Sequence, residues 1–199
     1  KEIVPTLGVK DLRGDWLFTW ADLNSNGGKV ELIPDKDWSG KSNINVLISQ
    51  LQTDGTLINS PLSTIALDVI GVADQPLLQL DKPTISEDSS LLIKDLITVS
   101  ELLDTDNSEE LSFSIDSLPD GVKLFQNYGK SNQFEIKKNN KEYIIKSDDL
   151  DKTSITAPLN FSGNLGFNIS AIANEKYFKS TSTNKKNANI YVRAIADAP

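Results

Sequence analysis

The stretch Phe167-Asn168-Ile169-Ser170-Ala171 alternates apolar with mostly polar side chains, and the related stretch Ile44-Asn45-Val46-Leu47-Ile48 stands 123 residues earlier (167 − 44 = 123). Alternation with a period of two places every second side chain on one face of an extended strand. The same offset separates two closing phrases, Val72–Pro76 and Ile195–Pro199 (199 − 76 = 123). A fixed offset of this kind indicates that the chain contains two copies of one unit.

The repeat predicts where each copy begins and ends. Trp16–Leu23 matches Tyr143–Leu150 at the slightly larger offset of 127 (143 − 16 = 127). Residues 77 to about 114 have no counterpart near the start of the chain. We therefore predict that residues 1–76 form the C-terminal part of one β-sandwich repeat, truncated at its front, and that residues 77–199 form a complete repeat.

Several other short segments show the same alternation between turn formers such as Asp54-Gly55 and Pro119-Asp120-Gly121. These segments are 16–20, 65–69, 111–115 and 190–192. Short alternating segments separated by turn signals are typical of all-β sandwiches. We predict an all-β chain of antiparallel β-sandwich (cadherin-like or immunoglobulin-like) repeats in tandem, with one helical turn expected within Leu96–Leu103.

Composition narrows the possible functions. The sequence contains no Cys, Met or His and has a formal net charge of −8. Zinc–thiolate sites, catalytic thiols and histidine acid/base catalysis are therefore excluded. An acidic chain lacks the positive surface that nucleic acids require, so cations are the expected partners. No apolar run approaches the roughly 18 residues of a membrane span.

The most acidic loop is Asp104-Thr105-Asp106-Asn107-Ser108-Glu109-Glu110, directly before an alternating segment. Calcium binds six to eight oxygen ligands, and this loop offers carboxylates close together. It is too short for an EF-hand. We predict that Asp104, Asp106 and Glu109 bind Ca²⁺.

Three further acids are candidate metal ligands: Glu87 near the start of the second copy, Asp149 in an Asp-rich run, and Asp74 in the first closing phrase. Asp197 is the counterpart of Asp74, so each could share a metal with the following repeat. The alternative for all these acids is a solvated turn, because Asp and Asn favour loops through their own backbone hydrogen bonds.

Two other functions are weighed against metal binding. A glycosidase would use a pair of carboxylates, but a strand-rich tandem module offers no obvious cleft, so we expect no enzymatic activity. A carbohydrate- or protein-binding module would expose Trp16, Trp20 or Trp38. Since aromatic residues at strand spacing are usually core residues, we interpret these tryptophans as core.

Five phrases resemble the tandem cadherin-like or immunoglobulin-like repeats of large RTX-type bacterial surface adhesins. They are Glu87-Asp88-Ser89, Asp104–Glu109 followed by Leu111, Leu118–Val122, Phe161-Ser162-Gly163 and Ala196–Pro199. Each phrase is weak alone, and their order and spacing carry the resemblance. The chain departs from the pattern at Asn107, where such loops commonly have Gly.

The resemblance implies a calcium-binding spacer in the extracellular, cell-surface part of an adhesin. Ca²⁺ bound in loops and at junctions would stiffen an extended fibre, with the neighbouring repeats of the same chain as partners. The truncated front of the first repeat adds one expectation. Its sheet edges must be covered, either by the second repeat or by sheet-edge pairing with another chain.

Overall fold

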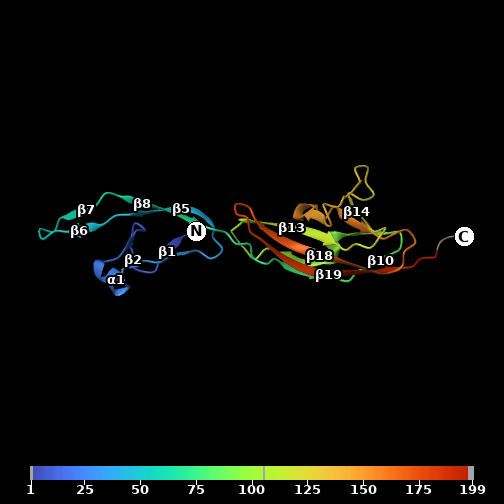
Figure 1. The fold of residues 1–199 in the computed structure, drawn as a ribbon, viewed down its shortest axis with the longest axis horizontal. Coiled ribbons are helices and arrows are strands. Elements are labelled where there is room, and N and C mark those ends of the chain that lie inside the picture. Colours follow the sequence, from blue (N-terminus) through green and yellow to red (C-terminus); the bar gives the residue numbers. More distant parts are fainter. Residues whose placement is uncertain (1, 105, 197–199) are drawn as a thin grey trace. The chain divides into compact units, whose positions relative to one another are not determined.

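The computed structural model describes residues 2–104 and 106–196, and most of its regular structure is β-strand (Figure 1). The chain divides into two compact units, Lys1–Gly71 and Val72–Pro199. The division falls just before the closing phrase Val72–Pro76, so this phrase lies in the second unit. No helix among the described residues is long and apolar enough to cross a membrane.

The first unit consists of short strands and one short helix. Its elements are β1 (Ile3–Pro5), β2 (Val9–Lys10), β3 (Trp16–Leu17), α1 (Trp20–Ser25), β4 (Leu32–Pro34), β5 (Gly40–Val46), β6 (Ser49–Leu51), β7 (Leu57–Asn59) and β8 (Ser63–Val69).

The second unit contains the longer strands. Its elements are β9 (Leu77–Leu80), β10 (Thr84–Ser86), β11 (Ser90–Leu92), α2 (Ile93–Leu96), β12 (Ile97–Glu101), β13 (Glu109–Asp116), β14 (Lys123–Gln126), β15 (Phe134–Glu135), β16 (Tyr143–Lys146), the 3₁₀ turn η1 (Ser147–Asp149), β17 (Thr153–Thr156), β18 (Gly163–Glu175) and β19 (Thr181–Arg193).

The described part of the second unit contains two larger sheets and the two-stranded antiparallel sheet β9-β12. The larger has the strand order β10-β19-β18-β13-β16, and the smaller has the order β11-β17-β14-β15. Pairing within both sheets is antiparallel apart from the edge pair of β10 with β19, which is parallel. Apolar side chains of both sheets meet in one core, so the predicted all-β sandwich is confirmed.

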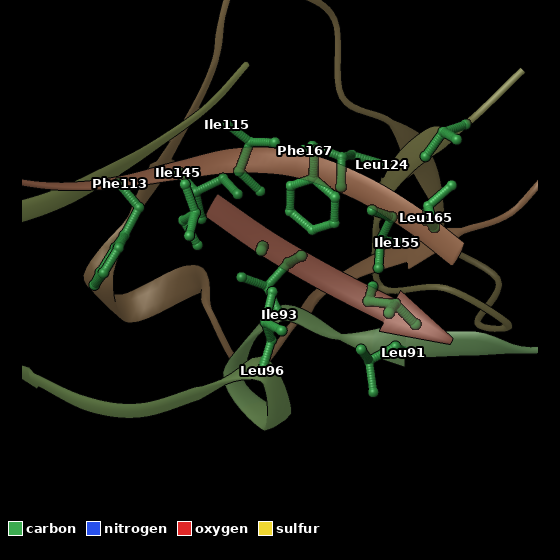
Figure 2. Close-up of a cluster of buried hydrophobic side chains, with 14 of the residues drawn as sticks. Leu91, Ile93, Leu96, Phe113, Ile115, Leu124, Ile145, Ile155, Leu165 and Phe167 are labelled. Carbon is green, nitrogen blue, oxygen red and sulfur yellow. The ribbon is translucent and has the colours of Figure 1, made fainter. Parts of the chain in front are cut away.

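The core is built from alternate residues of the central strands (Figure 2). Phe113 and Ile115 of β13 and Phe167 of β18 are buried against Leu124 and Ile155 of the smaller sheet. In β18 the odd-numbered side chains from Leu165 onward are all buried, as the period of two requires. This register fixes which face of the larger sheet is apolar.

Among its described residues, the first unit has no such core. It contains four two-stranded sheets, β1-β4, β2-β3, β5-β8 and β6-β7. Within residues 2–70 the structure buries no hydrophobic side chain, and Trp20 is 74% exposed. The interpretation of Trp16, Trp20 and Trp38 as core residues is therefore wrong for the described unit, since the two other tryptophans are only half-buried.

Two predicted local structures also differ. The strand expected through Trp20 stops at Leu17, because Thr19 and Asp22 form a capping box that begins α1. The helical turn expected within Leu96–Leu103 lies earlier, at Ile93–Leu96. Residues Ile97–Val99 include β-branched side chains that favour extended backbone, and they lie in β12.

Strand pairing reproduces the internal repeat. In the first unit, Gly40 pairs with Val69 and Val46 pairs with Ser63. The residues 123 positions later pair in the same way, Gly163 with Val192 and Ile169 with Lys186. The hairpin β5-β8 is thus the structural counterpart of β18-β19, in the same register.

A polar network joins three strands of the larger sheet. Asp116 of β13 accepts hydrogen bonds from Lys185 Nζ of β19 at 2.7 Å and from Asn168 Nδ2 of β18 at 2.8 Å. The Lys185 ammonium and the Asn168 amide lower the pKa of Asp116 to about 2. The ionised carboxylate therefore stabilises the folded state.

We predict that Asp116→Asn lowers the free energy of unfolding of the second unit by about 0.5–1 kcal/mol at pH 7, because Lys185 is half-exposed and screened by solvent. Because folding lowers the pKa of Asp116, its carboxylate stabilises the folded state above the ordinary Asp pKa of 3.8. This stabilisation is lost as pH falls towards 2. Urea unfolding between pH 5 and pH 2.5 should therefore show a smaller pH dependence in the variant. Glu135→Gln, which removes the ion pairs of the half-buried Glu135 with the largely exposed Lys123 and Lys137, is the control and should change stability less.

Candidate metal site

Three carboxylates meet at one end of the larger sheet. Oxygen atoms of Asp104, Glu109 and Glu175 lie within 4.8 Å of one another. Glu109 begins β13 and Glu175 ends β18, and the two residues are direct partners in the strand register. Like charges placed opposite each other on neighbouring strands destabilise a sheet. The cluster therefore costs free energy unless protons or a cation neutralise it.

The loop before β13 is folded by its own side chains. Asp104 Oδ1 accepts the Asp106 backbone N–H at 2.8 Å, and Asp106 Oδ1 accepts the Ser108 N–H at 2.6 Å. Asn107 has a φ of 66°, which Asn adopts more readily than most residues. Asn thus takes the left-handed conformation at the position where the resembling loops have Gly.

Further hydrogen bonds hold this loop against the end of β18. Ser108 Oγ donates to Asp104 Oδ2 at 3.0 Å, and the Lys176 N–H donates to the Ser108 carbonyl at 2.8 Å. Lys176 Nζ donates to the Asn107 carbonyl at 2.6 Å. These bonds fix Asp104 beside Glu175, although the two residues are far apart in the sequence.

Glu109 and Glu175 are unusually buried for acidic residues, at 4% and 7% exposed. Within the described residues, the Oε2 atom of each is buried and has no hydrogen-bond partner. The Oε1 atom of Glu175 lies 3.5 Å from Ser108 Oγ, at the limit of a hydrogen bond. Buried carboxylate oxygens are normally paired, because removing them from water without a partner is costly.

Both buried carboxyls have raised pKa values. Burial is the largest cause of the raised pKa of Glu109, and the negative charges of Asp104, Glu175 and Asp74 add to it. Burial likewise raises the pKa of Glu175, together with the charges of Asp104 and Asp106. A bound cation would act in the opposite direction and favour the ionised forms.

The segment that opens the second unit reaches this cluster. The Asp74 N–H donates to Glu109 Oε1 at 2.8 Å, and the Ala73 N–H donates to Ser180 Oγ at 2.8 Å. Gln75 Nε2 donates to the Thr183 carbonyl at 3.0 Å. The backbone at Asp74 is thereby held beside the buried acids, while the Asp74 side chain is exposed.

The structure separates the predicted site residues into two groups. Asp104 and Glu109 are in the cluster, and Asp74 and Asp106 lie next to it. Glu87 lies at the opposite end of β19, where its N–H donates to the Arg193 carbonyl at 2.9 Å and its Oε1 accepts the Ile195 N–H.

Asp149 belongs to the 3₁₀ turn η1, and its carboxylate pairs with Lys152 Nζ at 3.6 Å. It is not a member of the three-carboxylate cluster. Asp197, expected to be half of a second junction site, lies outside the described residues.

Sequence reasoning missed Glu175. Its counterpart 123 residues earlier is Gln52, so the repeat comparison gave no acid at this position. The available signal was the strand period: Glu175 is an even number of residues after Phe167 and Ala171, so it falls on their core-facing side. A carboxylate at a core position is rarely tolerated without a partner.

Comparisons with known proteins identify no family for this chain. No family model matches the chain, and no curated protein matches it. Among solved structures, fibronectin(III)-like modules of Clostridium thermocellum CbhA share 18% identity over 83% of this chain and 68% of theirs, with a TM-score of 0.25. So low a TM-score carries no argument for this chain. The second unit is a β-sandwich module with an acidic cluster that could hold a metal ion.

We predict that the second unit, freed of metal, becomes more stable as pH falls from 7 to 5. Glu109 and Glu175 have folded-state pKa values above the ordinary 4.5. Protonation therefore favours the folded state, and this stability is lost as pH rises from 4.5 through the folded pKa values. Chemical unfolding of chelator-treated, metal-depleted protein measures the effect.

The double variant Glu109→Gln/Glu175→Gln is the control for this prediction, since its side chains do not titrate. It should show little change in unfolding free energy between pH 7 and pH 5. An equal pH dependence in the variant and the parent would contradict the assignment.

Proposed function

We propose that the chain is a calcium-binding structural spacer from a bacterial cell-surface adhesin, and that Ca²⁺ stiffens the extended extracellular fibre to which it belongs. One observation carries the metal part of this proposal. Two buried carboxylate oxygens, Glu109 Oε2 and Glu175 Oε2, lack hydrogen-bond partners in the described structure and stand in a cluster with Asp104. A cation supplies the missing partner for both.

The donor set favours a hard cation. All three clustered side chains offer carboxylate oxygens, and the sequence has no Cys or His to favour zinc or copper. Ca²⁺ accepts six to eight oxygens in flexible geometries, whereas Mg²⁺ requires a near-ideal octahedron. We propose Asp104, Glu109 and Glu175 as ligands, with Asp74 and Asp106 as further donors close by.

The position of Asp74 supports a mechanical role. Asp74 follows the boundary between the two units by a few residues, and its backbone is bonded to Glu109. A cation that orders Glu109 would also order this segment, and an ordered segment limits the motion of what it connects. The surface location rests on the resemblance of the five phrases to adhesin repeats.

Glu87 remains a proposed ligand at the other end of β19. Its Oε1 atom accepts the backbone N–H of Ile195, one residue before the closing Ala-Asp-Ala-Pro phrase. We propose that Glu87 contributes to a junction site with the following repeat. Asp149, which has Lys152 as an ion-pair partner, is proposed only as a weaker, separate ligand.

We expect millimolar Ca²⁺ to raise the melting temperature of the chain and a chelator to reverse the rise. At 100 times the Kd, ligand binding adds about 2.7 kcal/mol to the free energy of unfolding. Glu175→Gln should reduce Ca²⁺ affinity at least tenfold by calorimetry, while its metal-free form should be more stable than the parent because one buried charge is removed. Small-angle scattering with and without Ca²⁺ tests the stiffening.

Glu110→Gln is the matched control, because Glu110 is the next residue of β13 and is exposed. It should keep the parent affinity. Unchanged melting temperature and no binding heat at millimolar Ca²⁺ would refute calcium binding. A rise in melting temperature without any change in scattering would refute only the mechanical role.

A further inference from the structure

The hairpin β5-β8 exposes the apolar face that its counterpart buries. Ile48, two residues after the end of β5, is 73% exposed, whereas Ala171, 123 residues later, is fully buried. Val46 and Ile65 are also exposed, and their counterparts Ile169 and Ala188 are buried. Both hairpins have the same register, so the difference lies in what covers them.

In the second unit, β13 covers one edge of β18. Ile115 stands opposite Ile169, and Phe113 stands opposite Ala171. The equivalent edge of β5 has no partner strand among the described residues, since β5 pairs only with β8. An apolar strand with a free edge is a site for addition of another strand.

A polar side chain marks the same edge in both units. Asn168 accepts a bond from Asn187 Nδ2 of β19 at 3.4 Å and donates through Nδ2 to Asp116 of β13. Its counterpart Asn45 accepts from Thr64 Oγ1 of β8 at 2.8 Å. Among the described residues, Asn45 Nδ2 makes no hydrogen bond. Asn45 Nδ2 is the counterpart of Asn168 Nδ2, which donates to Asp116 of β13.

We propose that the end of β5 and the residues that lead into β6 accept a segment with the pattern of β13, Leu-Ser-Phe-Ser-Ile-Asp, added antiparallel to their free edge. The register of β13 on β18, moved back by 123 residues, places the isoleucine opposite Val46, the phenylalanine opposite Ile48 and the aspartate beside Asn45. This proposal is independent of metal binding.

The partner strand comes from outside residues 2–196. A second copy of this chain could donate its own β13 only by giving up the pairing of that strand with both β16 and β18. It would also expose Phe113 and Ile115, which are fully buried. A separate segment of the same pattern bears no such cost.

The test is the full chain extended at its N-terminus by a copy of residues 108–117 on a flexible Gly/Ser linker. Tethering gives the short strand a high effective concentration. We expect hydrogen–deuterium exchange to slow at least tenfold, relative to the unextended chain, at those amides of residues 43–47 that do not already bond to β8. Replacing both the phenylalanine and the isoleucine of the appended copy with Asp should abolish this protection.

Two variants of β5 test the register. Asn45→Asp places a negative charge beside the donor aspartate and should reduce the protection, whereas Asn43→Asp lies beyond the end of the donor strand and should not. The proposal is overturned if the appended strand leaves exchange unchanged, or if both variants act alike. It is also overturned if the unextended chain already protects these amides, either as a monomer or as a dimer in sedimentation.

Discussion

The register of β18 is the constraint on which the second unit depends. Because side chains alternate along a strand, one register decides the facing of the whole strand Gly163–Glu175. The choice that buries Phe167 and Ile169 also turns Glu175 inward, opposite Glu109. A shift of β18 by one residue would turn Phe167 towards solvent and would also turn Glu175 away from Glu109. Core packing and the acidic cluster are therefore set by the same pairing.

The sheet tolerates the acids because they lie at its end. Glu109 and Glu175 are the terminal residues of their strands, so a loop and the segment around Asp74 can reach them with polar groups. In the middle of the sheet the same pair would meet only Phe113, Ile115 and their neighbours. The loop hydrogen bonds bring Asp104 closer instead of separating the charges, which costs stability in the metal-free protein. The three clustered carboxylates could hold a metal ion, which would offset this repulsion.

Much of the second unit could be predicted from the sequence. Alternation located β13, β18 and β19, and the acidic loop gave Asp104 and Glu109, because these features are local. The same alternation places Glu175 on the core-facing side of β18, but it does not give the contact with Glu109, which depends on pairing between residues 66 positions apart (175 − 109 = 66). Glu87 was predicted only as a further candidate ligand, and its position away from the acidic cluster follows from the nonlocal pairing of β10 with the far end of β19. The tryptophans were assigned to a core by spacing alone, and spacing does not reveal whether a second layer exists to cover them.

Comparing the hairpin β5-β8 with its counterpart β18-β19 shows which features follow from the local sequence and which require contacts with other strands. Matching registers in β5-β8 and β18-β19 show that alternation and turns suffice to specify the pairing. Burial does not follow from pairing: Ile44 of β5 remains partly exposed, whereas its counterpart Phe167 is enclosed by β13 and the smaller sheet. A two-stranded hairpin in water is at best marginally stable, so most of the stabilising free energy arises only when a third strand and a second layer remove the apolar face from solvent. The first unit therefore carries the information for its strand register, whereas its described residues 2–70 bury no hydrophobic side chain.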